Sequence, residues 1–167
     1  MFQFGGSLLK KSNAKTARPL STKKAMHVVL RSSRATGEWS LRNLRNQKIV
    51  ERILRRLAKE YGIKIHEFGN AGDHLHLLIR LKNRASFAPF IRALSGTIAL
   101  QVTKANKLTK LKEKFWDYRP WTRILELKKA YSLAKDALIL NHLAAIGYLA
   151  YRPRTLYESY FLKGAPS

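Results

Sequence analysis

The sequence predicts an α+β domain in which helices pack on a mostly antiparallel sheet. Three observations predict this class: stretches with helical hydrophobic periodicity, short β-branched or alternating segments between them, and a glycine-containing turn that joins two of those segments. In chain order the expected elements are strand, helix, strand, strand, helix, strand and helix. This order is close to the split β-α-β, ferredoxin-like arrangement, and 167 residues suffice for one such domain with short arms.

In the first half of the domain, one helix is expected between a strand and a hairpin. Residues 26–31, MHVVLR, are rich in β-branched side chains and predict the first strand. Residues 43–61 repeat apolar side chains at helical spacing, with basic residues on the opposite face. Residues 63–68 alternate as a half-buried strand does, GNAGD at 69–73 predicts a turn, and residues 74–81, HLHLLIRL, predict the strand that completes the hairpin.

The second half is expected to contain two helices around an aromatic strand. Residues 86–104 carry an apolar stripe at helical spacing, and a lysine-rich loop follows at 106–114. Residues 115–125, FWDYRPWTRIL, predict a last strand or pair of strands broken at the proline. A third helix is expected from about residue 128 to 146, where a glycine follows it.

The charge of the chain points to a polyanionic partner. There are 33 Lys and Arg residues against 10 Asp and Glu residues, which gives a net charge of +23 at pH 7. Residues 1–24 contain six of these cations and no acid, so they predict a basic N-terminal arm. Residues 25–150 then form the domain and residues 151–167 a C-terminal tail.

Absent residue types and segments exclude several classes of protein. Without cysteine the chain has no disulfide framework, no cysteine zinc site and no thiol nucleophile. No run of about 18 apolar residues predicts a membrane-spanning helix, and the N-terminus lacks the order of a secretory signal. We expect a cytoplasmic, nucleic-acid-associated protein.

A pair of histidines opens the third predicted strand. His74 and His76 are two residues apart, so both imidazoles point to one face of the strand and suit a divalent metal. The spacing alone also fits two histidines without a metal. Asp73 either orients one imidazole or is an ordinary turn residue, and Glu67 stands as the only acid of its strand. His27 either faces the same pocket or is a packed core histidine.

Residues 69–81, GNAGDHLHLLIRL, resemble the His-hydrophobic-His motif of the HUH endonuclease superfamily. More narrowly, the chain resembles the single-tyrosine transposases that include the REP-associated tyrosine transposases. The resemblance runs from about residue 20 to 148 and includes, in the same order, MHVVLR, FAPFIRALSGTIALQVTK, FWDYRPWTRIL and LILNHLAAIG. It implies an HUH nuclease fold and, because members commonly work as dimers, a homodimer.

The resemblance also implies a mechanism. In that family the two histidines bind Mg²⁺ or Mn²⁺, and a tyrosine of the last helix attacks a phosphate of single-stranded or hairpin DNA. The attack leaves a 5′-phosphotyrosine and a free 3′-hydroxyl, and strand transfer reverses it. The metal ligands implied here are His74 and His76, with Asn141 as third ligand.

The family's tyrosine is missing from its expected position. The motif Tyr-Ile-x-x-Asn-Pro, laid on ALILNH, puts Ala137 in place of the tyrosine and His142 in place of the proline. Tyr131, six residues earlier, lies about 9 Å along an ideal helix and about 120° around it. We take Tyr131 as the candidate nucleophile, with Tyr148 and Tyr118 as alternatives.

Two sets of residues are typical of nucleic-acid contacts. The basic face of the first predicted helix suits a DNA hairpin stem, and the aromatic strand interleaves rings that stack on bases with arginines that hold phosphates. At least one ring of that strand is expected in the core. The predicted DNA-binding residues are Arg45, Lys48, Arg52, Arg55, Arg56 and Lys59, together with Trp116, Arg119, Trp121 and Arg123.

The sequence therefore predicts a transposase-like protein that binds single-stranded or hairpin DNA and, with Mg²⁺ or Mn²⁺, cuts and rejoins it through a phosphotyrosine. One alternative is a domesticated, catalytically inactive DNA-binding protein, which the alanine at position 137 favours. A second alternative is a basic RNA-binding protein in which the histidine pair is incidental.

Overall fold

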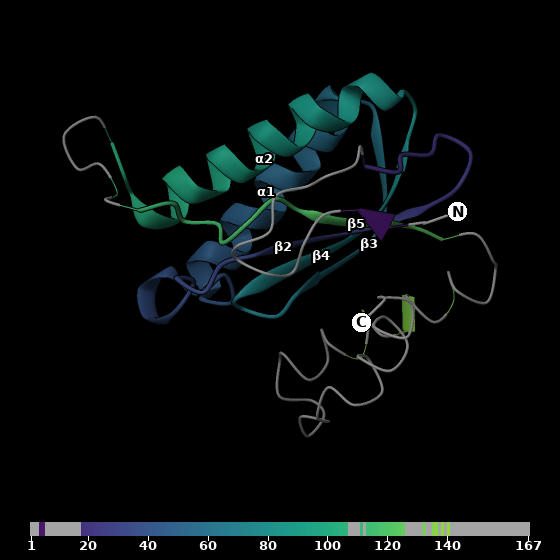
Figure 1. Cartoon of the computed structure of the whole chain (residues 1–167). Coiled ribbons are helices and arrows are strands. Elements are labelled where there is room, and N and C mark those ends of the chain that lie inside the picture. Colours follow the sequence, from purple (N-terminus) through teal and green to yellow (C-terminus); the bar gives the residue numbers. More distant parts are fainter. Residues whose placement is uncertain are drawn as a thin grey trace.

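The computed structural model describes residues 18–106, 111, 113–125, 132, 135, 136, 138 and 140, together with the backbone of residues 4 and 5. Within these residues a single antiparallel sheet is covered on one face by two long helices (Figure 1). The α+β class predicted from the sequence is confirmed. No helix in the described part of the chain is both long and apolar enough to cross a membrane.

The sheet contains β1 (Phe4–Gly5), β2 (Met26–Arg31), β3 (Ile63–Asn70), β4 (His74–Leu81) and β5 (Trp121–Ile124). Their order across the sheet is β1-β5-β2-β4-β3, and every neighbouring pair is antiparallel. Apart from the two-residue β1, the strands follow the split β-α-β arrangement, with the first strand of the domain at the centre. The hairpin β3–β4 therefore joins the central strand through β4.

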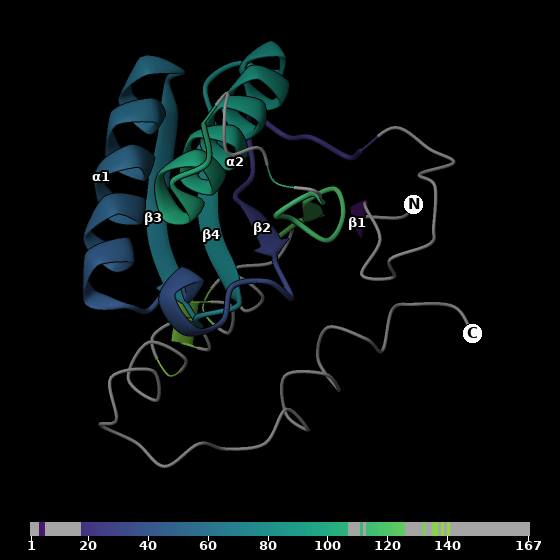
Figure 2. The same ribbon diagram turned by 90° about the vertical axis from the view of Figure 1, so that its left-hand side faces the viewer.

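The helices α1 (Leu44–Glu60) and α2 (Phe87–Thr103) lie side by side on one face of the sheet (Figures 1 and 2). Asn43 caps α1, because its side-chain oxygen accepts a hydrogen bond from the backbone of Arg45. The core between the layers contains alternate residues of β2 and β4, among them Val28 and Leu77, and the apolar stripes of both helices. Short 3-10 helices, Gly37–Trp39 and Arg84–Ser86, precede α1 and α2.

Two local expectations from the sequence were wrong. The strand β3 continues through Gly69 and Asn70, which were expected in the turn. Residues 115–119 form bends, and within 115–125 only Trp121–Ile124 form a strand. Within the residues predicted as the basic arm, Phe4 and Gly5 pair with Arg123 and Thr122 of β5. Of the predicted third helix, residues 132, 135, 136, 138 and 140 are described and helical.

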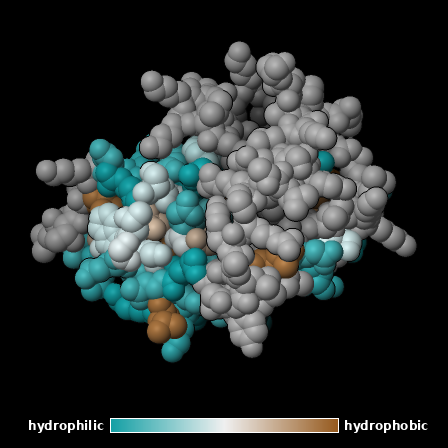
Figure 3. All heavy atoms as spheres, turned by 90° about the horizontal axis from the view of Figure 1, so that it is seen from below, coloured by the Kyte–Doolittle hydropathy of each residue, from teal (hydrophilic) through white to brown (hydrophobic). Residues whose placement is uncertain are grey.

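The face of the sheet opposite α1 and α2 contains a smaller apolar cluster of Leu78, Leu125 and Leu138. Leu138 is 1% exposed, so its side chain packs on this second face. On the side of the molecule seen in Figure 3, the described surface is mainly hydrophilic, with a few separate hydrophobic spots. The second face also carries the histidines, and the candidate functional site therefore lies on it.

Candidate functional site

The register between β2 and β4 gathers three histidines on the second face of the sheet. His27 stands opposite Leu78, and Val29 stands opposite His76, so His27 and His76 are diagonal neighbours. His74 stands opposite Arg31 at the end of both strands. The ring centroids of His74 and His76 are 4.7 Å apart, and those of His27 and His76 are 5.2 Å apart. The expectation that His74 and His76 share a face is borne out by the geometry.

His27 and His76 form a buried pair. They are 1% and 4% exposed, and Nε2 of His27 lies 3.0 Å from Nδ1 of His76. Burial lowers the pKa of His27 to about 3, with further lowering by Arg123 and His74. Burial and the two neighbouring histidines also hold the pKa of His76 well below its ordinary value. Both rings are therefore neutral near pH 7, the state in which an imidazole nitrogen binds a metal.

His74 is held by a carboxylate instead. Nδ1 of His74 lies 2.5 Å from Oδ1 of Asp73, and Oδ2 of Asp73 lies 3.8 Å from Nε of Arg31. Partial burial acts to raise the pKa of Asp73, but the hydrogen bond and charge of His74, together with Arg31, keep it below its ordinary value. Of the two interpretations of Asp73 from the sequence, the geometry matches the one in which it orients an imidazole.

Helical residues of the C-terminal segment lie against the histidine face. An ideal Cβ on Gly69 would be 3.0 Å from Cδ2 of Leu138 and 3.7 Å from Cβ of His76, so Leu138 packs tightly on the glycine. Glu67, on the same face of β3, forms an ion pair of 3.2 Å with Nζ of Lys135. Tyr131, Ala137, Asn141, His142 and Tyr148 lie outside the described residues.

Tyr118, the alternative nucleophile within the described residues, lies beside Arg31. Burial raises the pKa of its phenol, although the charge of the Arg31 guanidinium acts in the opposite direction. The neighbouring Asp117 donates its backbone N–H to the carbonyl of Arg31 at 3.0 Å and accepts a hydrogen bond from the backbone of Ser33. Tyr118 thus sits on a segment tied to the end of β2, with a phenol that stays protonated at neutral pH.

The residues predicted to contact DNA fall into two environments. All six basic residues of α1 are exposed, and so is Arg119. Trp121 is 8% exposed, with its ring centroid 5.5 Å from that of His27 in an edge-on arrangement, and Phe115 is also in the core. Trp116 is partly buried and donates its indole N–H to the carbonyl of Ser95 at 2.8 Å. The expectation that at least one ring of this segment is in the core is confirmed.

Sequence reasoning favoured a packed core role for His27 and missed its contact with His76. The parity of positions along β2 puts His27 on the face away from Val28, but only the register with β4 identifies its neighbour. Arg31, which lies next to Asp73, was missed for the same reason. Within the described part of the chain, no cluster of three or more His, Asp or Glu side chains has the geometry of a metal site.

Comparisons with known proteins agree with the fold. The chain is similar to the structure of a REP-associated tyrosine transposase bound to a REP hairpin, with a TM-score of 0.62, 13% identity and coverage of 82% of this chain and 76% of that one. A second structure, from a Deinococcus radiodurans R1 protein assigned as a transposase, gives a TM-score of 0.48 and 19% identity, covering 77% of this chain and 97% of that one. No curated protein matches the chain.

The sequence profile of the family described as "Transposase IS200 like" matches residues 21–130. This match covers more than half of the 167 residues, and it contains the histidine motif, both long helices and the strands β2 to β5. The resemblance to HUH-type single-tyrosine transposases, which the sequence motifs indicated, is thereby confirmed. The chain belongs to the IS200-like transposase family.

Proposed function

We propose that the protein binds single-stranded or hairpin DNA, cuts one strand through a phosphotyrosine intermediate and rejoins it. The observation that carries the proposal is the way the two motif histidines are held. Nδ1 of His74 faces the Asp73 carboxylate, and Nδ1 of His76 faces Nε2 of His27. If each Nδ1 carries the proton and donates it, the ligand nitrogen of both rings is Nε2.

The donor set fits a divalent cation, which we propose to be Mg²⁺ or Mn²⁺. Two imidazoles on one face are orientated by outer partners, and Asn141 is the proposed third ligand. Such a cation would supply Lewis-acid stabilisation of the charge that develops on a scissile phosphate. Asp73 and His27 hold the two rings, and burial keeps water away from His76.

The C-terminal helical segment is the proposed source of the nucleophile. Tyr131 precedes Leu138 by seven residues, and Asn141 follows it by three. Around an ideal helix Tyr131 falls about 20° and Asn141 about 60° from Leu138, the residue that packs on Gly69 beside His76. The Tyr131 oxygen would attack phosphorus, the bond to the 3′ oxygen would break, and that oxygen would take up a proton.

DNA would be held mainly by its phosphates. The exposed basic face of α1 and Arg119, with Arg123 beside His27, supplies the positive charge for this. Trp116 and Trp121 are packed, so we propose that their contribution is to support Arg119 and Arg123 and that stacking on bases is limited to their exposed edges. The finer parts of the proposal include a homodimer and a cytoplasmic location with the nucleoid. The relative with a bound REP hairpin supports a hairpin as the form of DNA.

A second candidate is a domesticated protein of this family that binds DNA without cutting it. The observation in its favour is the alanine at position 137, where the family motif has its tyrosine. The retained and well-held pair of His74 and His76 speaks for the catalytic proposal.

The test is adduct formation by the full chain. The purified protein is incubated with end-labelled single-stranded hairpin DNA and Mn²⁺, and a covalent protein–DNA adduct is sought on denaturing gels. We expect an adduct that is lost in His74→Ala and in Tyr131→Phe and retained in His66→Gln, a histidine of β3 outside the motif. If the adduct survives Tyr131→Phe but is lost in Tyr118→Phe, the nucleophile is Tyr118. If it is lost in Tyr148→Phe instead, the nucleophile is Tyr148. Salt-sensitive binding without an adduct would establish the non-catalytic candidate.

A further inference from the structure

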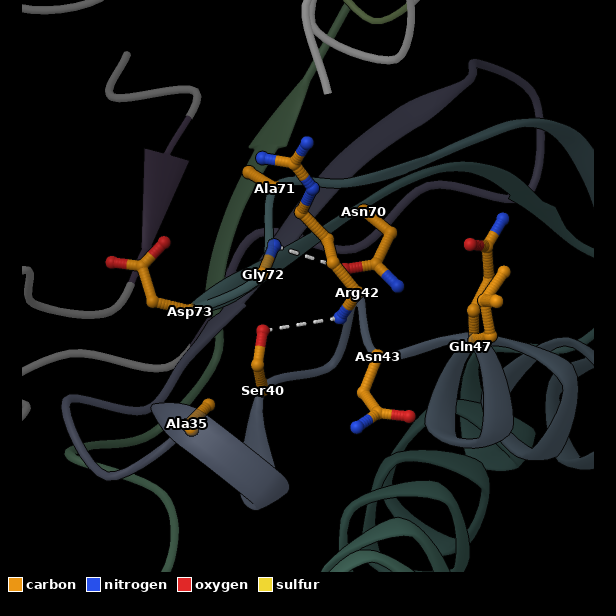
Figure 4. A pocket seen from close by; sticks show the side chains of 11 residues that line it. Ala35, Ser40, Arg42, Asn43, Gln47, Asn70, Ala71, Gly72 and Asp73 are labelled. Carbon is orange, nitrogen blue, oxygen red and sulfur yellow. Dashed lines mark hydrogen bonds between the residues drawn. The ribbon is translucent and has the colours of Figure 1, made fainter. Parts of the chain in front are cut away.

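A pocket of about 770 Å³ opens at the end of the sheet next to the histidine site. It lies between the β3–β4 turn and the N-terminal end of α1 (Figure 4). The residues that matter for its chemistry are Ser40, Arg42, Leu44, Gln47, Asn70 and Asp73. This volume is within the range of sites that take small organic ligands, about 300–1,000 Å³.

The floor of the pocket is held by backbone contacts. Asn70 is 4% exposed, and its amide donates to the carbonyl of Leu41 at 2.7 Å and accepts from the backbone of Gly72 at 3.0 Å. Leu41 in turn donates its backbone N–H to Gly72 at 2.9 Å. Gly72 has φ +97°, and a Cβ there would lie 3.0 Å from Cδ of Arg42. The Arg42 side chain therefore lies across a turn that only glycine allows.

The lining suits a flat, polar ring with several hydrogen-bonding groups on its edge. Arg42 supplies donors, and Gln47 supplies an amide whose contact to Glu51 is a long 3.4 Å. Leu44, at the rim, is 78% exposed and offers an apolar surface to the face of a ring. In Figure 4 the Arg42 guanidinium lies beside Ala71 of the β3–β4 turn, Gln47 stands across the pocket on α1, and Asp73 lies on the side of the turn away from Gln47. Arginine and side-chain amides are the groups that pair with the edges of purines.

We propose that this pocket takes an unpaired purine base from the DNA strand that is bound at the histidine site. Asp73 joins the two places, since it lines the pocket and its carboxylate contacts Nδ1 of His74. A base in the pocket would fix the adjoining phosphate near His74. The presence of a DNA strand at the histidine site follows from the proposed function, on which this inference rests. The preference for a purine follows from Arg42, Leu44 and Gln47.

The first experiment follows the backbone amides of the ¹⁵N-labelled full chain by NMR during titration with single deoxynucleoside monophosphates. We expect dGMP or dAMP to shift the amides of Gln47, Asn70 and Gly72, and dCMP, dTMP and inorganic phosphate to leave them in place. Equal shifts with inorganic phosphate would show an anion site and overturn the proposal. Absence of shifts with every nucleotide would overturn it too.

The second experiment compares binding of dT12 with that of the same oligonucleotide carrying one internal dA or dG. We expect the purine to tighten binding about tenfold. Arg42→Ala and Leu44→Ala should remove this preference while retaining binding of dT12. The matched controls Arg84→Ala and Leu100→Ala change an exposed arginine and an exposed leucine elsewhere and should keep it.

The two proposals fail differently. If the wild-type protein binds dT12 without preferring a purine, or if both pocket variants keep the preference, the pocket assignment is wrong and the proposed function stands. If the protein binds no DNA at all, the proposed function fails, while the nucleotide titration still decides what the pocket takes.

Discussion

Nε2 of His27 lies 3.0 Å from Nδ1 of His76, and the two rings are stacked at an interplanar angle of 17°. The contact is buried and joins the central strand β2 to β4. It gives His76 an outer partner of a kind different from that of His74, whose Nδ1 faces the carboxylate of Asp73. A neutral partner raises the basicity of a ligating imidazole less than a carboxylate does. The two motif histidines are therefore not equivalent.

Replacement of His27 by phenylalanine should weaken binding of Mn²⁺ about tenfold, because His76 loses the partner that orients its ring. Isothermal titration with Mn²⁺ measures the affinity, and circular dichroism checks that the variant is folded. His66→Gln, on the neighbouring strand β3, is the control and should bind as the wild type does. Unchanged affinity in His27→Phe would show that His27 is only a packed residue.

The metal-free protein should lose stability as the pH falls below about 6.5. Above this pH His27 is neutral in the folded and the unfolded chain, so its contribution is fully present. Below it the unfolded chain takes up a proton that folded His27, with a pKa of about 3, does not. The free energy of unfolding should then fall by about 1.4 kcal/mol per pH unit for this histidine, and His76 shifts in the same direction.

Urea denaturation in the presence of a chelator, at pH 7.5, 6.5 and 5.5, measures this slope. His27→Gln removes one of the two buried histidines and should show a shallower slope over the same range. Equal slopes in the variant and the wild type would mean that His27 titrates normally in the folded protein.

Substitution of Gly69 by valine should displace the helical residues around Leu138 from the sheet. Even a Cβ at this position would lie 3.0 Å from Cδ2 of Leu138, and valine adds two methyl groups to it. We expect a loss of about 1–3 kcal/mol of stability and of the Mn²⁺-dependent adduct. Gly96→Ala is the control, since a Cβ there meets nothing within 4 Å and alanine favours a helix by about 0.5–1 kcal/mol. A stable, active Gly69→Val protein would contradict the packing.

Neutralising part of the basic face of α1 should make DNA binding less sensitive to salt. In the triple variant Arg52→Gln, Arg55→Gln and Arg56→Gln, up to three phosphate contacts are lost. For single-stranded DNA the slope of log K against log salt should decrease by about 0.7 for each lost contact. Fluorescence anisotropy between 50 and 300 mM NaCl measures it, with Lys82→Gln and Arg84→Gln as the control pair. If the salt slope of the triple variant equals that of the control, these three arginines of α1 do not contact DNA.

The sequence predicted those elements that a local pattern determines, and it failed for those that depend on contacts between distant parts of the chain. The β-branched residues of Met26–Arg31 and the turn that precedes His74–Leu81 were enough to predict β2 and β4 with their bounds. The segment 115–120 was predicted as extended because of its aromatic residues. It bends because the Phe115 carbonyl accepts a hydrogen bond from the Ser32 hydroxyl. In addition, Asp117 donates its backbone N–H to Arg31 of β2 and accepts a hydrogen bond from the backbone of Ser33. Such partners are far away in the chain.

The candidate site shows the same division. The spacing of His74 and His76 predicted a shared face, because strand geometry alone fixes it. The partner of His76 could not be predicted, because it depends on the register between β2 and β4. The pocket at Gly72 was missed as well, since it arises where the β3–β4 turn meets the start of α1. No local sequence pattern predicts that these two segments lie together.

The contact between His27 and His76 spans 49 positions of the chain, and this separation bears on how the protein folds. The β3–β4 hairpin closes a short loop and can form early, whereas pairing of β2 with β4 closes a much longer one and is intrinsically slow. The imidazole of His27 therefore reaches its position beside His76 only after β2 has docked on β4. In a chain with the hairpin formed but β2 not yet docked, His74 and His76 lie on the hairpin without His27 beside them. The folding order itself thus delays full assembly of the proposed DNA-cutting site until the sheet is complete.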